Sequence, residues 1–96
     1  MTRFVDIDGT ICRTFGTSYI TSEPMPERIA VVNKWYDEGD RIVYWTSRGM
    51  GNGKDWRHLT MTQLSKWGCR YHQLRMDKPI FDAFYDDHAH NAERMD

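Results

Sequence analysis

The chain has 96 residues, with 13 Lys and Arg against 14 Asp and Glu, so its formal net charge is −1. This near-balance argues against a general nucleic-acid-binding protein, which carries a clear basic excess. A hydrophobic fraction of 40% supports one packed core, so we expect a single domain over residues 1–96 and no disordered chain.

The first half of the chain predicts a strand, a loop and a helix. Thr2–Val5 is short, rich in β-prone residues and followed at once by acidic residues, which predicts a buried strand. Residues 11–25 have the composition of a loop or hairpin. Pro26 suits the first turn of a helix, and apolar residues then recur at helical spacing until Gly39, which predicts its C-terminal end.

The second half repeats this alternation. Arg41–Trp45 predicts a second strand, and a second helix is expected from about Asp55 to Trp67, although its apolar pattern is imperfect. A short strand near Tyr71–Met76 and a last strand over Phe81–Tyr85 complete the order β-α-β-α-β-β. Helices between strands imply parallel pairing with right-handed crossovers, so the expected fold is a minimal Rossmann-like α/β sheet with flanking helices.

Polar side chains gather where the predicted strands end. They are Asp6 and Asp8, Thr46 and Ser47, Lys78, and the pair Asp86 and Asp87. In open α/β sheets the carboxyl edge is where ligands bind. Carboxylates gathered there repel one another unless a cation neutralises them, and Mg²⁺ suits a site made only of oxygen atoms. Beside that cation, Thr46 would donate a hydrogen bond and Lys78 would supply charge to a bound phosphate.

Four segments also form an ordered series of motifs. Asp6–Thr10 reads D-x-D-G-T, Ile42–Thr46 is a hydrophobic strand ending in Thr, Lys78 follows, and Phe84–Asp87 is a hydrophobic strand ending in paired acids. In this order they resemble the four motifs of the haloacid dehalogenase (HAD) superfamily of phosphohydrolases. The resemblance covers nearly the whole chain, and its first motif is the most specific.

This resemblance implies a role for each matching residue. Asp6 would be the nucleophile that forms an aspartyl-phosphate, and Asp8 would act first as general acid and then as general base. Residues two apart in an extended segment point the same way, so both carboxylates can face one phosphoryl group. Thr46, Ser47 and Lys78 would bind phosphate. The implied Mg²⁺ ligands are Asp6, the main-chain carbonyl of Asp8, Asp87, and Asp86 directly or through water.

The spacing of the motifs resembles the capless branch of the superfamily. Thr10 to Arg41 leaves room for a loop and one helix, and Ser47 to Asp77 for one helix and one strand, so neither interval fits a cap domain. The sheet would then have about four strands in the order 4-1-2-3. The implied function is a Mg²⁺-dependent phosphomonoester hydrolase.

The expected partners follow from the same reading. The substrate would be small and phosphorylated, such as a sugar phosphate or a nucleotide, with nucleic acid only as a phosphorylated end; a homo-oligomer is open. No apolar run approaches the ~20 residues of a membrane span. Because the N-terminus lacks a secretory signal and Cys12 and Cys69 are far apart, we expect reduced thiols in a cytoplasmic protein.

Other readings of these residues stay open at this point. A phosphoacceptor signalling module uses similar groups, but its lysine comes last, whereas Lys78 precedes Asp86 here. A non-catalytic phosphate-binding module fits the intact Asp6 and Asp8 pair poorly. Arg48 would touch the substrate or lie on the surface. Several of these residues could also have a purely structural role. Thr46 could make a local turn hydrogen bond, and Lys78 could be a solvated loop lysine. One of Asp86 and Asp87 could cap a helix, and His88 and His90 could lie exposed.

Overall fold

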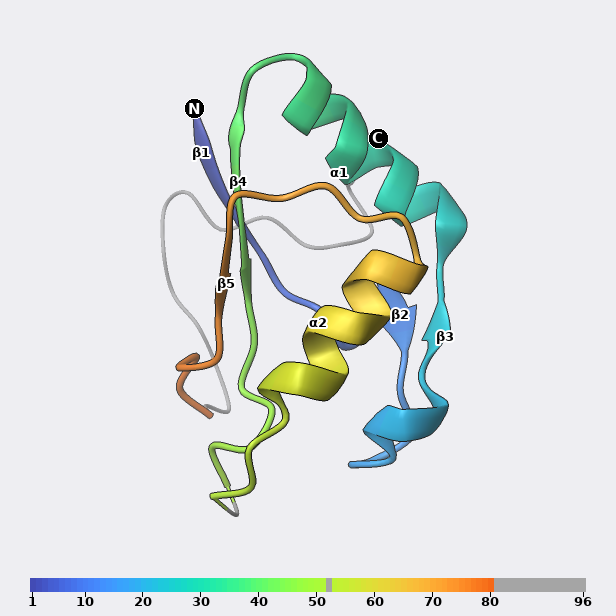
Figure 1. Cartoon of the computed structure of the whole chain (residues 1–96), viewed down its shortest axis with the longest axis vertical. Coiled ribbons are helices and arrows are strands. Elements are labelled where there is room, and N and C mark those ends of the chain that lie inside the picture. The colour runs from blue at the N-terminus through green and yellow to red at the C-terminus, as the bar shows by residue number, and fades with distance from the viewer. Residues whose placement is uncertain (52, 81–96) are drawn as a thin grey trace.

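A parallel three-stranded sheet lies at the centre of the described chain, which in this computed structural model comprises residues 1–51 and 53–80 (Figure 1). The strands are β1 (Thr2–Val5), β4 (Arg41–Trp45) and β5 (Gln73–Arg75), in the spatial order β1-β4-β5. Phe4 pairs with Val43 and Tyr44 with Leu74, and both pairings are parallel. The three strands predicted from residues 1–80 are therefore confirmed, the third shorter than expected.

Two helices connect the strands and cover one face of the sheet. Helix α1 (Pro26–Asp37) precedes β4, and α2 (Arg57–Lys66) lies between β4 and β5. The chain moves across the sheet in one direction, so two crossovers of the same hand place both helices on the same side (Figure 1). The core lies between the layers and contains, from the helices and the strands facing them, Ile29, Val32, Leu64, Val5, Ile42, Tyr44 and Leu74.

Residues 11–25 form the hairpin that their composition predicts. Strand β2 (Cys12–Arg13) pairs antiparallel with β3 (Glu23–Pro24), and a short 3₁₀ turn, η1 (Tyr19–Thr21), lies between them. The hairpin begins just beyond the carboxyl end of β1. It therefore stands beside the sheet edge at which the predicted site residues meet.

The expected fold is confirmed in its coarse form. The intervals that a cap domain would occupy hold the hairpin with α1, and a loop with α2 and β5, so the described residues contain no cap. The predicted strand Phe81–Tyr85 lies outside the described residues, and the four-strand order 4-1-2-3 stays a prediction. No helix in residues 1–51 and 53–80 is long and apolar enough to cross a membrane.

Asp40 ties the turn after α1 to the first strand. Its carboxylate accepts hydrogen bonds from Arg3 Nε at 2.8 Å and from the Met1 amino group at 2.9 Å. Because Arg3 and the amino group stabilise the ionised form, the pKa of Asp40 is lowered.

We predict that Asp40→Asn lowers the free energy of unfolding at pH 7 and has less effect in acid. The native pKa lies below the unfolded value of about 3.9, so this stabilisation is complete above the unfolded pKa and is lost as the pH falls through the native pKa. Urea titrations at pH 7 and pH 3 measure it, with Glu38→Gln, an exposed carboxylate nearby, as the control. An Asp40→Asn effect of equal size at both pH values would contradict the assignment.

Candidate active site

The carboxyl end of β1 places two acidic side chains on either side of a buried residue. Asp6 and Asp8 flank Ile7, which is fully buried and anchors this segment in the core. The chain then turns sharply, because the Ile11 N–H donates to the Ile7 carbonyl at 3.0 Å. The turn starts the hairpin and keeps both carboxylates at the sheet edge.

Asp6 faces the lysine predicted to bind phosphate. Lys78 Nζ lies 3.1 Å from Asp6 Oδ2, and the Lys78 side chain is largely buried. The main chain of Lys78 is held beside the end of β4, because the Lys78 N–H donates to the carbonyl of Thr46 at 3.1 Å. The reading of Lys78 as a solvated loop lysine is therefore wrong, and three predicted site residues lie together.

Thr46 directly follows the last residue of β4 and is buried. Its Oγ1 accepts a hydrogen bond from the Arg48 N–H at 3.2 Å, which is the local turn bond considered for it. A hydroxyl has one proton to donate as well, so this bond leaves Thr46 able to donate to a phosphate oxygen. Ser47 is half-buried in the loop that follows, and its carbonyl accepts from the Met50 N–H at 3.0 Å.

Asp8 forms a two-pronged ion pair with Arg48. Arg48 Nη2 donates to Asp8 Oδ1 at 2.8 Å, and Arg48 Nε donates to Oδ2 at 3.0 Å. Thr14 of the hairpin donates to Oδ1 at 2.6 Å. Burial alone would raise the pKa of Asp8, but the hydrogen bonds from Arg48 and Thr14 and the charge of Arg48 outweigh it and lower the pKa. Asp8 is therefore held as a carboxylate.

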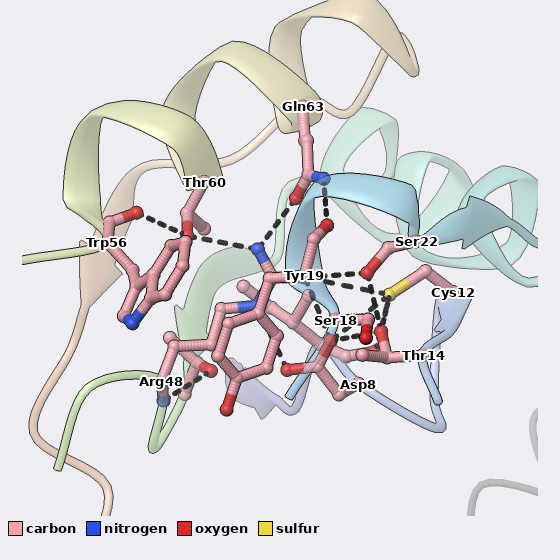
Figure 2. Close-up of polar contacts among 12 residues, drawn as sticks. Asp8, Cys12, Thr14, Ser18, Tyr19, Ser22, Arg48, Trp56, Thr60 and Gln63 are labelled. Atoms are coloured by element: carbon pink, nitrogen blue, oxygen red, sulfur yellow. Dashed lines mark hydrogen bonds and ion pairs between the residues drawn. The ribbon is translucent and has the colours of Figure 1, made fainter. Parts of the chain in front are cut away.

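Arg48 is the main site residue whose place the sequence left open. It is only 2% exposed, so the surface role considered for it is wrong. Figure 2 shows its guanidinium between Asp8 and two side chains of α2, with Nη1 donating to Thr60 Oγ1 at 3.1 Å and to Gln63 Oε1 at 2.6 Å. The imperfect apolar pattern of α2 signalled that the inner face of this helix is partly polar, because Thr60 and Gln63 are buried there, but it did not identify Arg48 as their partner.

Two aromatic rings border the Asp8 side of the site. Tyr19 of η1 lies over the Arg48 guanidinium, 4.8 Å from ring centroid to Cζ, and meets the Trp56 ring edge-on at 5.1 Å (Figure 2). Burial raises the pKa of Tyr19, and the nearby Asp8 carboxylate adds to this. The hairpin and the start of α2 thus meet through Tyr19 and Trp56.

The described residues supply part of a possible Mg²⁺ site. The Asp8 carboxylate is engaged on both oxygens by Arg48, so what Asp8 can offer a cation is its main-chain carbonyl, as the resemblance implies. Asp6 offers carboxylate oxygens, which are the ligands that Mg²⁺ prefers. Residues 1–51 and 53–80 contain no group of three or more His, Cys, Asp or Glu placed to hold a metal. The other predicted ligands, Asp86 and Asp87, lie outside the described residues, as do His88 and His90.

Comparison with known proteins supports the fold. No family model and no curated protein matches the chain. The crystal structure of a structural-genomics target from Vibrio cholerae is similar, with a TM-score of 0.86 and 26% identity, over 98% of this chain and 85% of that one. This likeness extends across the sheet, both helices and the hairpin, and that protein carries no functional name.

The loop that follows Arg48 depends on Gly49. This residue has φ +85°, and a Cβ added to it would collide with the Lys54 carbonyl oxygen and meet the Trp56 ring at 3.2 Å. Gly53 in the same loop has φ +70° but open space around the same position. Both glycines have a positive φ, but only Gly49 is closely packed. Comparing substitutions at the two positions therefore separates the effect of backbone conformation from that of close packing.

We predict that Gly49→Ala destabilises the protein much more than Gly53→Ala. Left-handed backbone alone costs a non-glycine residue about 1 kcal/mol, whereas the collision at Gly49 raises the total to about 3 kcal/mol. Urea unfolding of both variants against the parent protein measures the difference. Equal losses in the two variants would show that the loop does not pack as described.

Proposed function

We propose that this chain is a small, capless phosphatase of the HAD type, a Mg²⁺-dependent phosphomonoester hydrolase that works through an aspartyl-phosphate on Asp6. The observation that carries the proposal is the position of Asp6, which faces Lys78 at 3.1 Å beside Thr46 and two residues from Asp8. A nucleophile, a fixed cation and an acid–base group at one sheet edge are the parts that phosphoryl transfer needs.

The proposed fold would complete this site. In the order 4-1-2-3, the strand Phe81–Tyr85 would pair with the free edge of β1. Asp86 and Asp87 would then follow at the same sheet edge as Asp6. The described strand order β1-β4-β5 supports this arrangement, because it leaves one side of β1 without a neighbour among the described strands.

The first half-reaction transfers the phosphoryl group to the protein. An Asp6 carboxylate oxygen forms the new bond to phosphorus, and the bond between phosphorus and the leaving oxygen breaks. That oxygen takes a proton from Asp8, which rests as a carboxylate and therefore binds a proton from solvent before this step. Lys78, Thr46 and Ser47 stabilise the charge on the phosphoryl oxygens. When bound through Asp6, the Asp8 carbonyl and the Asp86–Asp87 pair, Mg²⁺ would supply further neutralisation of that charge.

The second half-reaction regenerates Asp6. Asp8 takes a proton from a water molecule, whose oxygen forms a bond to phosphorus while the bond to Asp6 breaks. Inorganic phosphate leaves, and release of the proton to solvent returns Asp8 to its resting carboxylate form. We propose a small phosphorylated substrate, such as a sugar phosphate or a nucleotide. The described residues place no cap over the sheet edge, so the substrate would reach the site directly from solvent.

Asp6→Asn tests the nucleophile. The amide is close in size to the carboxylate but is a poor nucleophile, so we expect kcat for p-nitrophenyl phosphate to fall at least about a hundredfold with the fold preserved. Asp37→Asn, an exposed carboxylate on α1, is the matched control and should keep full activity. A variant that keeps about a tenth of the parent kcat would exclude Asp6 as the nucleophile.

Metal dependence tests the proposed cofactor. We expect hydrolysis to stop in EDTA, to return with Mg²⁺ and to fall in excess Ca²⁺, because Ca²⁺ takes more ligands at longer distances and would draw the second oxygen of Asp6 away from attack. The rate of p-nitrophenol release under the three conditions measures this. Undiminished turnover in EDTA would reject the metal assignment.

A further inference from the structure

Arg48 donates hydrogen bonds to more acceptors than it would need merely to neutralise the charge of Asp8. Its Nε and Nη2 reach the two oxygens of Asp8, at 3.0 and 2.8 Å, while Nη1 reaches Thr60 and Gln63 on α2. The guanidinium is planar and rigid, so a single orientation satisfies all of these acceptors. A lysine would supply the same charge to Asp8 but could not bind both oxygens and α2 together.

The two acceptors on α2 are themselves fixed by other bonds. Thr60 Oγ1 donates its proton to the Trp56 carbonyl at 2.7 Å, so its lone pair is left to face Arg48. Gln63 Nε2 donates to the Tyr19 carbonyl at 2.6 Å, which turns its Oε1 toward Arg48. Figure 2 shows these side chains converging on the guanidinium from α2 and η1.

The same network reaches Asp8 from the hairpin. Thr14 donates to Asp8 Oδ1 at 2.6 Å and shares a 2.6 Å contact with the Ser22 hydroxyl. Rotation of the Asp8 carboxylate would therefore break bonds to Arg48 and to Thr14 at once. Arg48 is buried and Thr14 is half-buried, and away from solvent broken hydrogen bonds to charged groups are costly.

We propose that Arg48 is the positioning residue for Asp8 and that α2, through Thr60 and Gln63, fixes the orientation of Arg48. This inference rests on the proposed function of Asp8 as the group that activates water. Proton transfer depends on hydrogen-bond geometry, so a carboxylate aimed in one direction serves it better than one free to rotate. Arg48 touches neither phosphate nor water in this role and acts through Asp8.

The proposal predicts an unusual kinetic signature for Arg48→Lys with p-nitrophenyl phosphate. The p-nitrophenolate leaving group needs little help from an acid, so formation of the aspartyl-phosphate should proceed nearly unchanged. Its hydrolysis needs an oriented Asp8 and should slow about tenfold, the size expected for losing a hydrogen bond to a charged group. We therefore expect kcat and KM to fall together, kcat/KM to change less than about threefold, and a burst of p-nitrophenol to appear.

This split distinguishes positioning from simple damage to the fold. A smaller folded fraction would lower kcat and kcat/KM equally and leave KM unchanged. The matched control is Arg70→Lys, which alters an exposed arginine that pairs with Asp37 at 2.7 Å away from the site and should change neither constant. If Arg48→Lys does not fold, Gln63→Met, which keeps the side-chain length, should give the same burst with a smaller fall in kcat.

Each outcome separates the inference from the function on which it rests. A parent protein that hydrolyses no phosphomonoester, or that stays active as Asp6→Asn, overturns the proposed function. If the parent protein turns over through Asp6, the result for Arg48→Lys, or for Gln63→Met in its place, decides the positioning role alone. Unchanged kinetic constants, or an equal loss of kcat and kcat/KM, would overturn that role and leave the proposed function standing.

Discussion

Two carboxylates held two residues apart at the end of β1 are the constraint on which the rest of the structure depends. Like charges at this separation repel, and each is answered by a cation from a segment that follows another strand: Lys78 after β5 for Asp6, and Arg48 after β4 for Asp8. The two pairs are not equivalent. Asp6 is paired through one oxygen with a flexible ammonium, whereas Asp8 is held on both oxygens by a rigid fork.

This difference matches the division of work that we propose. A nucleophile must leave its cation and move toward phosphorus, so a single ion pair suits Asp6. A group that passes protons must keep its direction through both half-reactions, so a fixed carboxylate suits Asp8. The hairpin and α2 take part in the same network, because Thr14 contacts Asp8 and Gln63 contacts the Tyr19 carbonyl. With no cap among the described residues, these two elements form the walls on the Asp8 side of the site.

The sequence predicted the parts of this arrangement that depend on local patterns. The hydrophobic runs predicted where the strands lie and placed the helix bounds within two residues. The parallel order of the strands predicted that Asp6, Thr46 and Lys78 lie close together. The ion pair between Asp8 and Arg48 joins residues 40 positions apart and depends on side-chain rotamers, which no periodicity reveals. Gln63 and Thr60 were visible only as polar interruptions of an apolar helix face, without any sign of their partner. The last predicted strand and the Asp86–Asp87 pair stay predictions.

The aspartyl-phosphate is the central claim, and trapping it is the most direct test. The protein is mixed with p-nitrophenyl phosphate and Mg²⁺, quenched in acid within one turnover, digested and examined by mass spectrometry. The account predicts one added phosphoryl group on the peptide that contains Asp6, and its absence from Asp6→Asn. Release of phosphate with no phosphorylated residue, or with the phosphoryl group on another side chain, would contradict it.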